Sequence, residues 1–306
     1  MDNYTKMTKD WLDQRFRTID EEGIYVAHQP IYGFRRGHSE QGILSRYIIT
    51  FQIMKLLSHL KFTSLLDIGG AEGYTAAIVQ HIFGVDVRSC DLSEEACYRA
   101  KEIFNIDGQQ VDIHELPFQD NEFDVVLCSE TLEHVPDLHQ ATIELIRVCK
   151  KAVIITVPHE SKKVIEKNIR ENIPHSHIHS LSLRSFNFSL SHASRVLSHR
   201  ILSRFTRVSR LFVDAIERKE IMRYSGMVVS MYNFFIPVLR TIFGKRLSII
   251  LIYLDEILCS TIPLYDGMIF IILKNEDFYF DRQQKNVSAR QIIEYSVPYH
   301  YLGSQA

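Results

Sequence analysis

One segment of the chain combines glycines with an acid in a spacing suited to close contact with a ligand. Residues 67–73 read Asp-Ile-Gly-Gly-Ala-Glu-Gly. Glycine has no Cβ, so the backbone can approach a bound molecule, and the N–H groups of a following helix can receive polar ligand atoms. A dinucleotide site would need the pattern Gly-x-Gly-x-x-Gly. Because Ala71 and Tyr74 stand two and five positions after Gly69, that pattern is absent, which disfavours a nicotinamide enzyme.

A second segment brings together two carboxylates and an imidazole. A helical turn over this segment would place Glu130, Glu133 and His134 at positions i, i+3 and i+4, on one face. Such a set can bind a hard or borderline divalent cation. The same groups can also work without a metal, with the histidine as a base, or serve structure alone. His177, in a histidine-rich run farther along the chain, can supply a further ligand.

Alternating strands and helices must position these two segments. Apolar residues recur at helical spacing in some stretches and form short continuous runs in others. The predicted strands are 64–68, 85–90, 110–113, 123–128 and 152–157. The predicted helices are 46–60, 74–83, 94–104 and 137–149. Strands that alternate with helices of this length indicate a parallel, doubly wound sheet whose carboxyl edge carries both segments.

The second half of the chain is less regular and completes the predicted fold. It contains a predicted helix at 190–198, a strand at 201–208 and a last, antiparallel strand at 267–273. We therefore expect an α/β, Rossmann-like, mostly parallel sheet of about seven strands with helices on both faces. The expected parts are an N-terminal lid segment (1–45), the core (46–160), a substrate or cap region with the sixth strand (161–266), the last core strand (267–274) and a C-terminal tail (275–306).

The ordered motifs of the first half resemble those of class I S-adenosyl-L-methionine (SAM)-dependent methyltransferases, close to their type 11 group. Asp67, Gly69 and Gly73 form the pattern Asp-x-Gly-x-x-x-Gly, and Leu116-Pro117-Phe118 and residues 121–126 follow the middle motifs of that family. The resemblance implies SAM as cofactor.

The same resemblance assigns roles to individual residues. Asp91 would contact the ribose hydroxyls, for which a carboxylate is a suitable acceptor. Asp112 and Ile113 would contact adenine, and Gly69 and Gly73 the methionine part. The implied cofactor residues are Asp67, Gly69, Gly70, Gly73, Asp91, Leu92, Asp112, Ile113 and Ser129.

The Glu-x-x-Glu-His element is similar to that of two metal-dependent branches, the small-RNA terminal 2′-O-methyltransferases and the ubiquinone-pathway O-methyltransferases. This similarity implies Mg or Zn bound by Glu130, Glu133, His134 and His177, with His177 nine positions before Phe186. Both branches methylate one hydroxyl of a vicinal pair. The sequence Leu-Glu-His-Val also occurs in methyltransferases without a metal, so a metal-free site with His134, His177 and Glu130 as catalytic residues stays open.

Composition limits which binding partners and which cellular compartment we expect for the protein. The chain has 306 residues, 46% hydrophobic and 24% charged, with a net charge of −2, so it is an ordinary globular chain without a nucleic-acid footprint. Five scattered cysteines and an N-terminus without an apolar signal stretch favour a cytoplasmic protein. The apolar stretch 224–239 is interrupted by Pro237 and shorter than the ~20 residues of a membrane span.

Two regions leave alternatives open. Residues 195–246 hold eleven Lys or Arg against three Asp or Glu. Together with the apolar residues up to 265, they predict either a solvated helical cap or a face that meets a membrane or lipid-like substrate. The N-terminal segment is a lid or a packed strap, with lid candidates Tyr25, His28, Gln29, Tyr32 and Arg46.

From these observations we expect methyl transfer from SAM to an oxygen of a small or lipophilic molecule. A non-catalytic SAM-binding protein on the same fold is the alternative. Such a protein would be expected to lose the glycine loop or Asp91, and both are intact.

Overall fold

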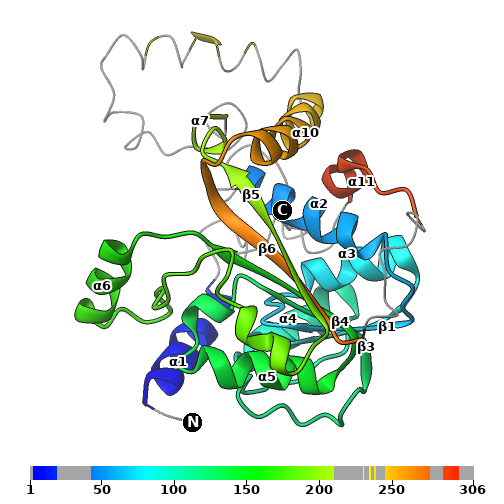
Figure 1. Cartoon of the computed structure of the whole chain (residues 1–306), viewed down its shortest axis with the longest axis vertical. Helices are drawn as coiled ribbons and strands as arrows, with labels where there is room; N and C mark the ends of the chain where they lie inside the picture. The colour runs from blue at the N-terminus through cyan, green and yellow to red at the C-terminus, as the bar shows by residue number, and fades with distance from the viewer. Residues whose placement is uncertain are drawn as a thin grey trace.

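A six-stranded sheet forms the centre of the described structure (Figure 1). The computed structural model describes residues 3–18, 43–209, 245–275 and 285–295, together with the single residues 230, 234, 235 and 238. The strand order is β2-β1-β3-β4-β6-β5. The strands are β1 (Ser64–Ile68), β2 (Asp86–Cys90), β3 (Phe123–Ser129), β4 (Cys149–Pro158), β5 (Arg195–Ser203) and β6 (Tyr265–Leu273).

Strand direction confirms the predicted Rossmann-like α/β fold. β1 pairs in parallel with β2 and β3, and β3 pairs in parallel with β4. β6 runs antiparallel to both β4 and β5. The prediction of a last, antiparallel strand over 267–273 is therefore correct, and the carboxyl ends of β1 to β4 meet at one edge of the sheet.

Helices flank the sheet and have clear local signals at their ends. They are α1 (Asn3–Arg17), α2 (Ile43–Leu57), α3 (Tyr74–Phe83), α4 (Glu94–Phe104), η1 (Leu132–His134), α5 (Leu138–Val148), α6 (Lys162–Glu171), η2 (Asn187–Ser191), α7 (Thr206–Ser209), α10 (Lys245–Thr261) and α11 (Ala289–Glu294). Ser93 caps α4 by accepting a hydrogen bond from the amide of Ala96, as its sequence predicted. α3 ends at Gly84, whose left-handed conformation stops the helix.

Alternate residues of the central strands face two separate hydrophobic cores. Leu65 and Val125 pack with α2, α3, α10 and α11, whereas Leu66 and Val126 pack with α5 and the segment around Phe186. Side chains of a strand alternate between its two faces, so nearly continuous apolar strands bury both. The sheet is thus rigid on both sides, and it fixes the loops at its carboxyl edge.

Two predicted elements are wrong. Residues 110–113 form isolated bridges, Asp91 to Gln110 and Asp112 to Glu115, and not a strand. The Asp112 carboxylate accepts a hydrogen bond from the amide of His114, a local turn that competes with strand pairing. The described residues therefore contain six strands where about seven were expected.

The helix predicted over 190–198 is the second error. η2 ends at Ser191, and β5 begins at Arg195 and pairs along its length with β6. Pairing with a neighbouring strand overrides weak helical spacing. The strand predicted over 201–208 covers only the last residues of β5, and α7 follows it.

Some sequence predictions lie outside the described residues. These are the lid candidates Tyr25, His28, Gln29 and Tyr32 and most of the apolar stretch 224–239. Within the described part of the chain, no helix is long and apolar enough to cross a bilayer.

Candidate active site

A cavity of about 650 Å³ opens at the carboxyl ends of β1, β2 and β3. Its size falls in the range of small-molecule sites in proteins. It brings the segment after β1 and β2 together with the Glu-His segment after β3, so both predicted groups of residues border one space. Of the nine predicted cofactor residues, six border it: Gly69, Asp91, Leu92, Asp112, Ile113 and Ser129. The other three, Asp67, Gly70 and Gly73, are not among the residues that line it.

The glycine loop is shaped by packing as well as by its exposure to the cavity. Gly69 and Gly73 have φ values of +74° and +79°, which favour glycine. A Cβ on Gly69 would lie 2.1 Å from the Thr131 hydroxyl, and a Cβ on Gly73 would lie 2.8 Å from that of Ala100. Gly69 therefore brings the loop against the segment after β3, and Gly73 lets α4 approach.

The carboxylate of Asp91 fixes this loop from the end of β2. One of its oxygens accepts a hydrogen bond from the Ala71 amide (3.0 Å), and the other accepts one from the Ser93 amide (2.9 Å). Burial raises the pKa of Asp91, and these amide hydrogen bonds act in the opposite direction. Asp91 both orders the loop and borders the cavity, where its predicted ribose contact stays a prediction.

Asp112 has a partner that the sequence did not single out. His114 Nδ1 lies 2.7 Å from the Asp112 carboxylate, and both side chains border the cavity. Ser129, at the end of β3, shares a 2.7 Å hydrogen bond with the Thr156 hydroxyl of β4. These contacts fix two polar walls of the cavity.

Helix α1 lies in the predicted lid segment 1–45 and forms a wall of the cavity, although none of its residues was among the lid candidates. Thr5, Thr8, Leu12 and Phe16 border the cavity and recur at helical spacing. Asp13 anchors the helix by accepting a 2.5 Å hydrogen bond from the Ser93 hydroxyl. The spacing signals a buried helix face, but nothing in the sequence says which part of the protein that face covers.

Aromatic rings connect α1 to the histidine-rich segment after α6. Trp11 stacks on His175 with 5.0 Å between ring centroids, and His175 stacks on His134 at 3.8 Å. The Tyr4 hydroxyl donates to the Ser176 carbonyl at 3.3 Å. Burial lowers the pKa of His175 to about 4, so this ring is neutral at neutral pH and can stack without charge repulsion.

The Glu-His segment does not form the single helical face that its spacing suggested. Glu130 has φ +53°, and its amide donates to the Thr156 carbonyl of β4 (2.9 Å). Only Leu132–His134 form a helical turn, of the 3₁₀ type. The hydrogen bond to β4 keeps Glu130 outside the turn. Glu130 still borders the cavity, from its position before the turn.

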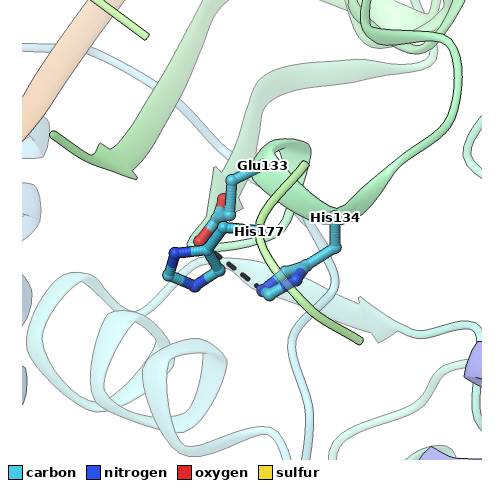
Figure 2. A group of neighbouring side chains, drawn as sticks. All are labelled: Glu133, His134 and His177. Carbon is cyan, nitrogen blue, oxygen red and sulfur yellow. Dashed lines mark ion pairs between the residues drawn. The ribbon is translucent and has the colours of Figure 1, made fainter. Parts of the chain in front are cut away.

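Three side chains converge next to this turn. Single ligand atoms of Glu133, His134 and His177 all lie within 4.8 Å of one another (Figure 2). Glu133 Oε1 is 3.7 Å from His134 Nε2, and the His134 and His177 rings are 4.8 Å apart. One carboxylate with two imidazoles is a donor set that suits a borderline cation such as Zn²⁺. Glu130, a predicted fourth ligand, is not part of this group.

The burial of the Glu133 carboxylate makes its charged form unfavourable. Its side chain is 1% exposed, and Oε2 has no hydrogen-bond partner among the described residues. Burial raises the pKa of Glu133 well above its usual range, and the nearby charge of Glu130 raises it further. A cation or a donor group of a ligand would relieve this cost.

Glu160 is a further residue that the sequence did not single out. Its Oε2 lies 3.1 Å from His177 Nδ1, and the interaction with His177 lowers the pKa of Glu160. The pair orients the His177 ring toward Glu133 and His134. The only available signal was the position of Glu160 just after the strand β4.

Part of the chain is similar to known methyltransferases. Residues 66–157 match the family model described as "Methyltransferase domain". The chain is 36% identical over 93 residues to the uncharacterized methyltransferase YcgJ of Bacillus subtilis, covering 28% of this chain and 36% of the relative. It is 32% identical over 127 residues to norajmaline N-methyltransferase of Rauvolfia serpentina, covering 36% and 44%.

A solved structure with a similar arrangement is phosphoethanolamine N-methyltransferase 2 of Haemonchus contortus in complex with SAM. The TM-score is 0.49 at 16% identity, over 79% of this chain and 59% of that one. The chain spans only 24% to 44% of the length of the curated relatives it matches. The family match runs from within β1 to near the end of β4 and includes the loops that carry Asp91, Asp112 and Glu133. Residues 66–157 of this chain are thus similar to known methyltransferase domains.

Proposed function

We propose that this chain transfers a methyl group from SAM to an oxygen of a small, lipophilic molecule. One observation carries the proposal: a cavity of about 650 Å³ joins the predicted cofactor residues to a buried group of carboxylate and imidazole side chains. A donor and an acceptor could lie side by side in that space. Methyl transfer from a sulfonium is a displacement that depends mainly on such alignment.

The charge of the cavity wall suits a cationic cofactor. Asp91, Asp112, Glu130 and Glu133 border it, whereas Arg46 is its one Lys or Arg side chain among the described residues. Burial raises the pKa of Asp91, Glu130 and Glu133, and a cation bound beside these groups favours their charged form. The sulfonium and ammonium groups of SAM are both positive.

His134 is the base that best fits an oxygen acceptor. Its Nδ1 lies 3.1 Å from the Ser176 carbonyl, which can only accept, so Nδ1 carries the proton. In the neutral ring, Nε2 is then the basic nitrogen, on the side of Glu133. His177, held by Glu160, is the second candidate for this role.

The lipophilic character of the acceptor follows from the remaining walls. Leu12 and Phe16 of α1, Ile49 of α2 and Leu202 of β5 border the cavity with apolar surface. In this proposal α1 is the lid, residues 46–160 bind the cofactor, and residues 161–266 cover the acceptor.

Calorimetry followed by a transfer assay tests the proposal. SAM should bind and NAD should not; no heat with SAM would refute the cofactor assignment. Labelled SAM is then incubated with hydroxylated lipids and with amines of similar size. His134→Gln should lower transfer about 100-fold or more while SAM still binds. His192→Gln, on an exposed histidine, is the control. Methylated amines alone would contradict oxygen as the acceptor, and binding without any transfer would indicate a SAM-binding protein.

A metal-dependent variant of this reaction is the second candidate. It is favoured by the convergence of Glu133, His134 and His177 and by the unpartnered, buried oxygen of Glu133. These three residues would hold Mg or Zn, which would lower the pKa of a hydroxyl in a vicinal diol. Metal ligands must be deprotonated, so affinity should rise with pH. Full activity after chelation, or unchanged Zn²⁺ binding by Glu133→Ala in calorimetry, would remove this candidate.

A further inference from the structure

Several large apolar side chains are exposed on and next to α7 and α10, two helices that contact each other (Figure 1). Each is between 42% and 59% exposed. The members of this apolar end face are Phe205, Val208, Ile250, Ile257, Ile262 and Leu264. Ile250 and Ile257 stand seven positions apart on α10 and therefore on one stripe of the helix. Exposed apolar side chains on adjoining elements are a feature of interaction sites.

Buried hydrogen bonds join the parts of this face into one unit. The Asp255 carboxylate of α10 accepts from the amide and the hydroxyl of Ser203 (both 2.7 Å) and from the Thr206 hydroxyl (2.5 Å). The Arg204 amide donates to the Leu264 carbonyl at 3.1 Å. The start of α7 and the turn after α10 are thus fixed to α10.

Basic side chains flank the apolar end face. Arg204 and Arg207 both pair with Asp266 and keep a net positive charge, because they share one carboxylate. Arg246 is exposed at the start of α10.

This combination identifies the partner by its chemistry. Apolar side chains surrounded by cations suit an anionic lipid surface, whose headgroups attract the cations while the apolar groups enter the interface. A second copy of the chain would instead place like charges against each other. We propose that the apolar end face docks on the surface of an anionic lipid bilayer.

Docking there would place the bilayer near the proposed active site. Leu202 borders the cavity and lies three residues before Phe205. A lipophilic acceptor would then reach the cavity along the end of β5 without crossing water. The docking step needs neither SAM nor catalysis, so it can fail or succeed independently of the proposed methyl transfer.

Sedimentation of the full chain with vesicles tests the proposal. The protein should sediment with vesicles of phosphatidylcholine and phosphatidylserine in equal parts, remain in solution with phosphatidylcholine alone, and be released by high salt. Ile257→Asp should lower the partition coefficient about tenfold or more. Arg246→Glu should lower it as well, but by a smaller factor. Ile169→Asp is the matched control, because Ile169 is 57% exposed on α6, at another side of the molecule (Figure 1).

Other results would overturn the proposal. Absence of wild-type binding to the anionic vesicles would do so, and so would an equal loss in the Ile169→Asp control. Dimerisation that Ile257→Asp abolishes, without vesicle binding, would mean that a second copy occupies the face. A large loss of thermal stability in Ile257→Asp but not in the control, again without vesicle binding, would mean that the chain itself covers it.

Discussion

The buried carboxyl group of Asp67 offers a sharp test of the electrostatics behind the glycine loop. Asp67 is 1% exposed, and its Oδ2 has no hydrogen-bond partner among the described residues. Burial raises the pKa of Asp67 from 3.8 to about 7, with a further contribution from the charge of Asp91. The folded protein therefore binds this proton more tightly than the unfolded chain does.

The sign and the magnitude follow from this difference. Between about pH 4 and pH 7 the folded state holds a proton that the unfolded state has lost, so the Asp67 contribution lowers stability as the pH rises. Three pKa units at 1.36 kcal/mol each amount to about 4 kcal/mol. Asp67→Asn removes the charge but keeps the shape. The stability of the variant relative to wild type should therefore increase by up to about 4 kcal/mol between pH 4 and pH 8.

Urea unfolding at a series of pH values measures this difference. Taking the variant minus wild type at each pH cancels the other titrating groups. Asp107→Asn is the control, because Asp107 is exposed and Lys101 lowers its pKa, so its difference should be flat above about pH 5. A flat Asp67→Asn difference, or one that falls as the pH rises, would refute the reasoning.

Three further predictions concern packing and anchoring. Gly73→Ala should lose about 2–4 kcal/mol of stability in urea unfolding, because φ is +79° and the new methyl group meets Ala100. Gly84→Ala is the control: φ is +68° but the space around it is open, so it should lose only about 1 kcal/mol. Equal losses would contradict the packing argument. Lys274→Met should lower the free energy of unfolding by about 2–3 kcal/mol, since Nζ donates to the carbonyls of Ile146 and Cys149 (both 2.8 Å). An unchanged midpoint of urea unfolding would show that water replaces the ammonium group at these carbonyls. Asp13→Ala should weaken SAM binding about tenfold in calorimetry by releasing α1, and unchanged affinity would exclude α1 as a lid.

Local rules were sufficient for much of the fold. The strands β1 and β3 and the helices α3 and α4 have the bounds that their apolar runs and end residues predicted to within one residue. They were predictable because Gly84 and Ser93 act through neighbouring backbone alone. The spacing of Gly69 and Gly73 also reflects a local need, since both adopt positive φ.

Contacts that apolar spacing does not encode explain the errors. The first residues of β5 were predicted as part of a helix. The hydrogen bonds that make them a strand go to β6, which lies more than sixty residues later in the chain. The turn at Asp112 was predicted as a strand because apolar spacing does not show the local hydrogen bond that the Asp112 carboxylate accepts from the His114 amide. Neither partner can be identified from the spacing of apolar residues.

The sequence by itself determined which chemistry is available: a glycine loop, Asp91 and Asp112 for a cofactor, and carboxylates with histidines near the carboxyl edge of the sheet. Only the tertiary structure decided which of these groups meet. It grouped Glu133 and His134 with His177, left Glu130 outside that group because its amide bonds to β4, and added Glu160 and α1. The physical reason is that helical spacing fixes neighbours within a turn, whereas a site built from several loops depends on how the sheet brings distant segments together.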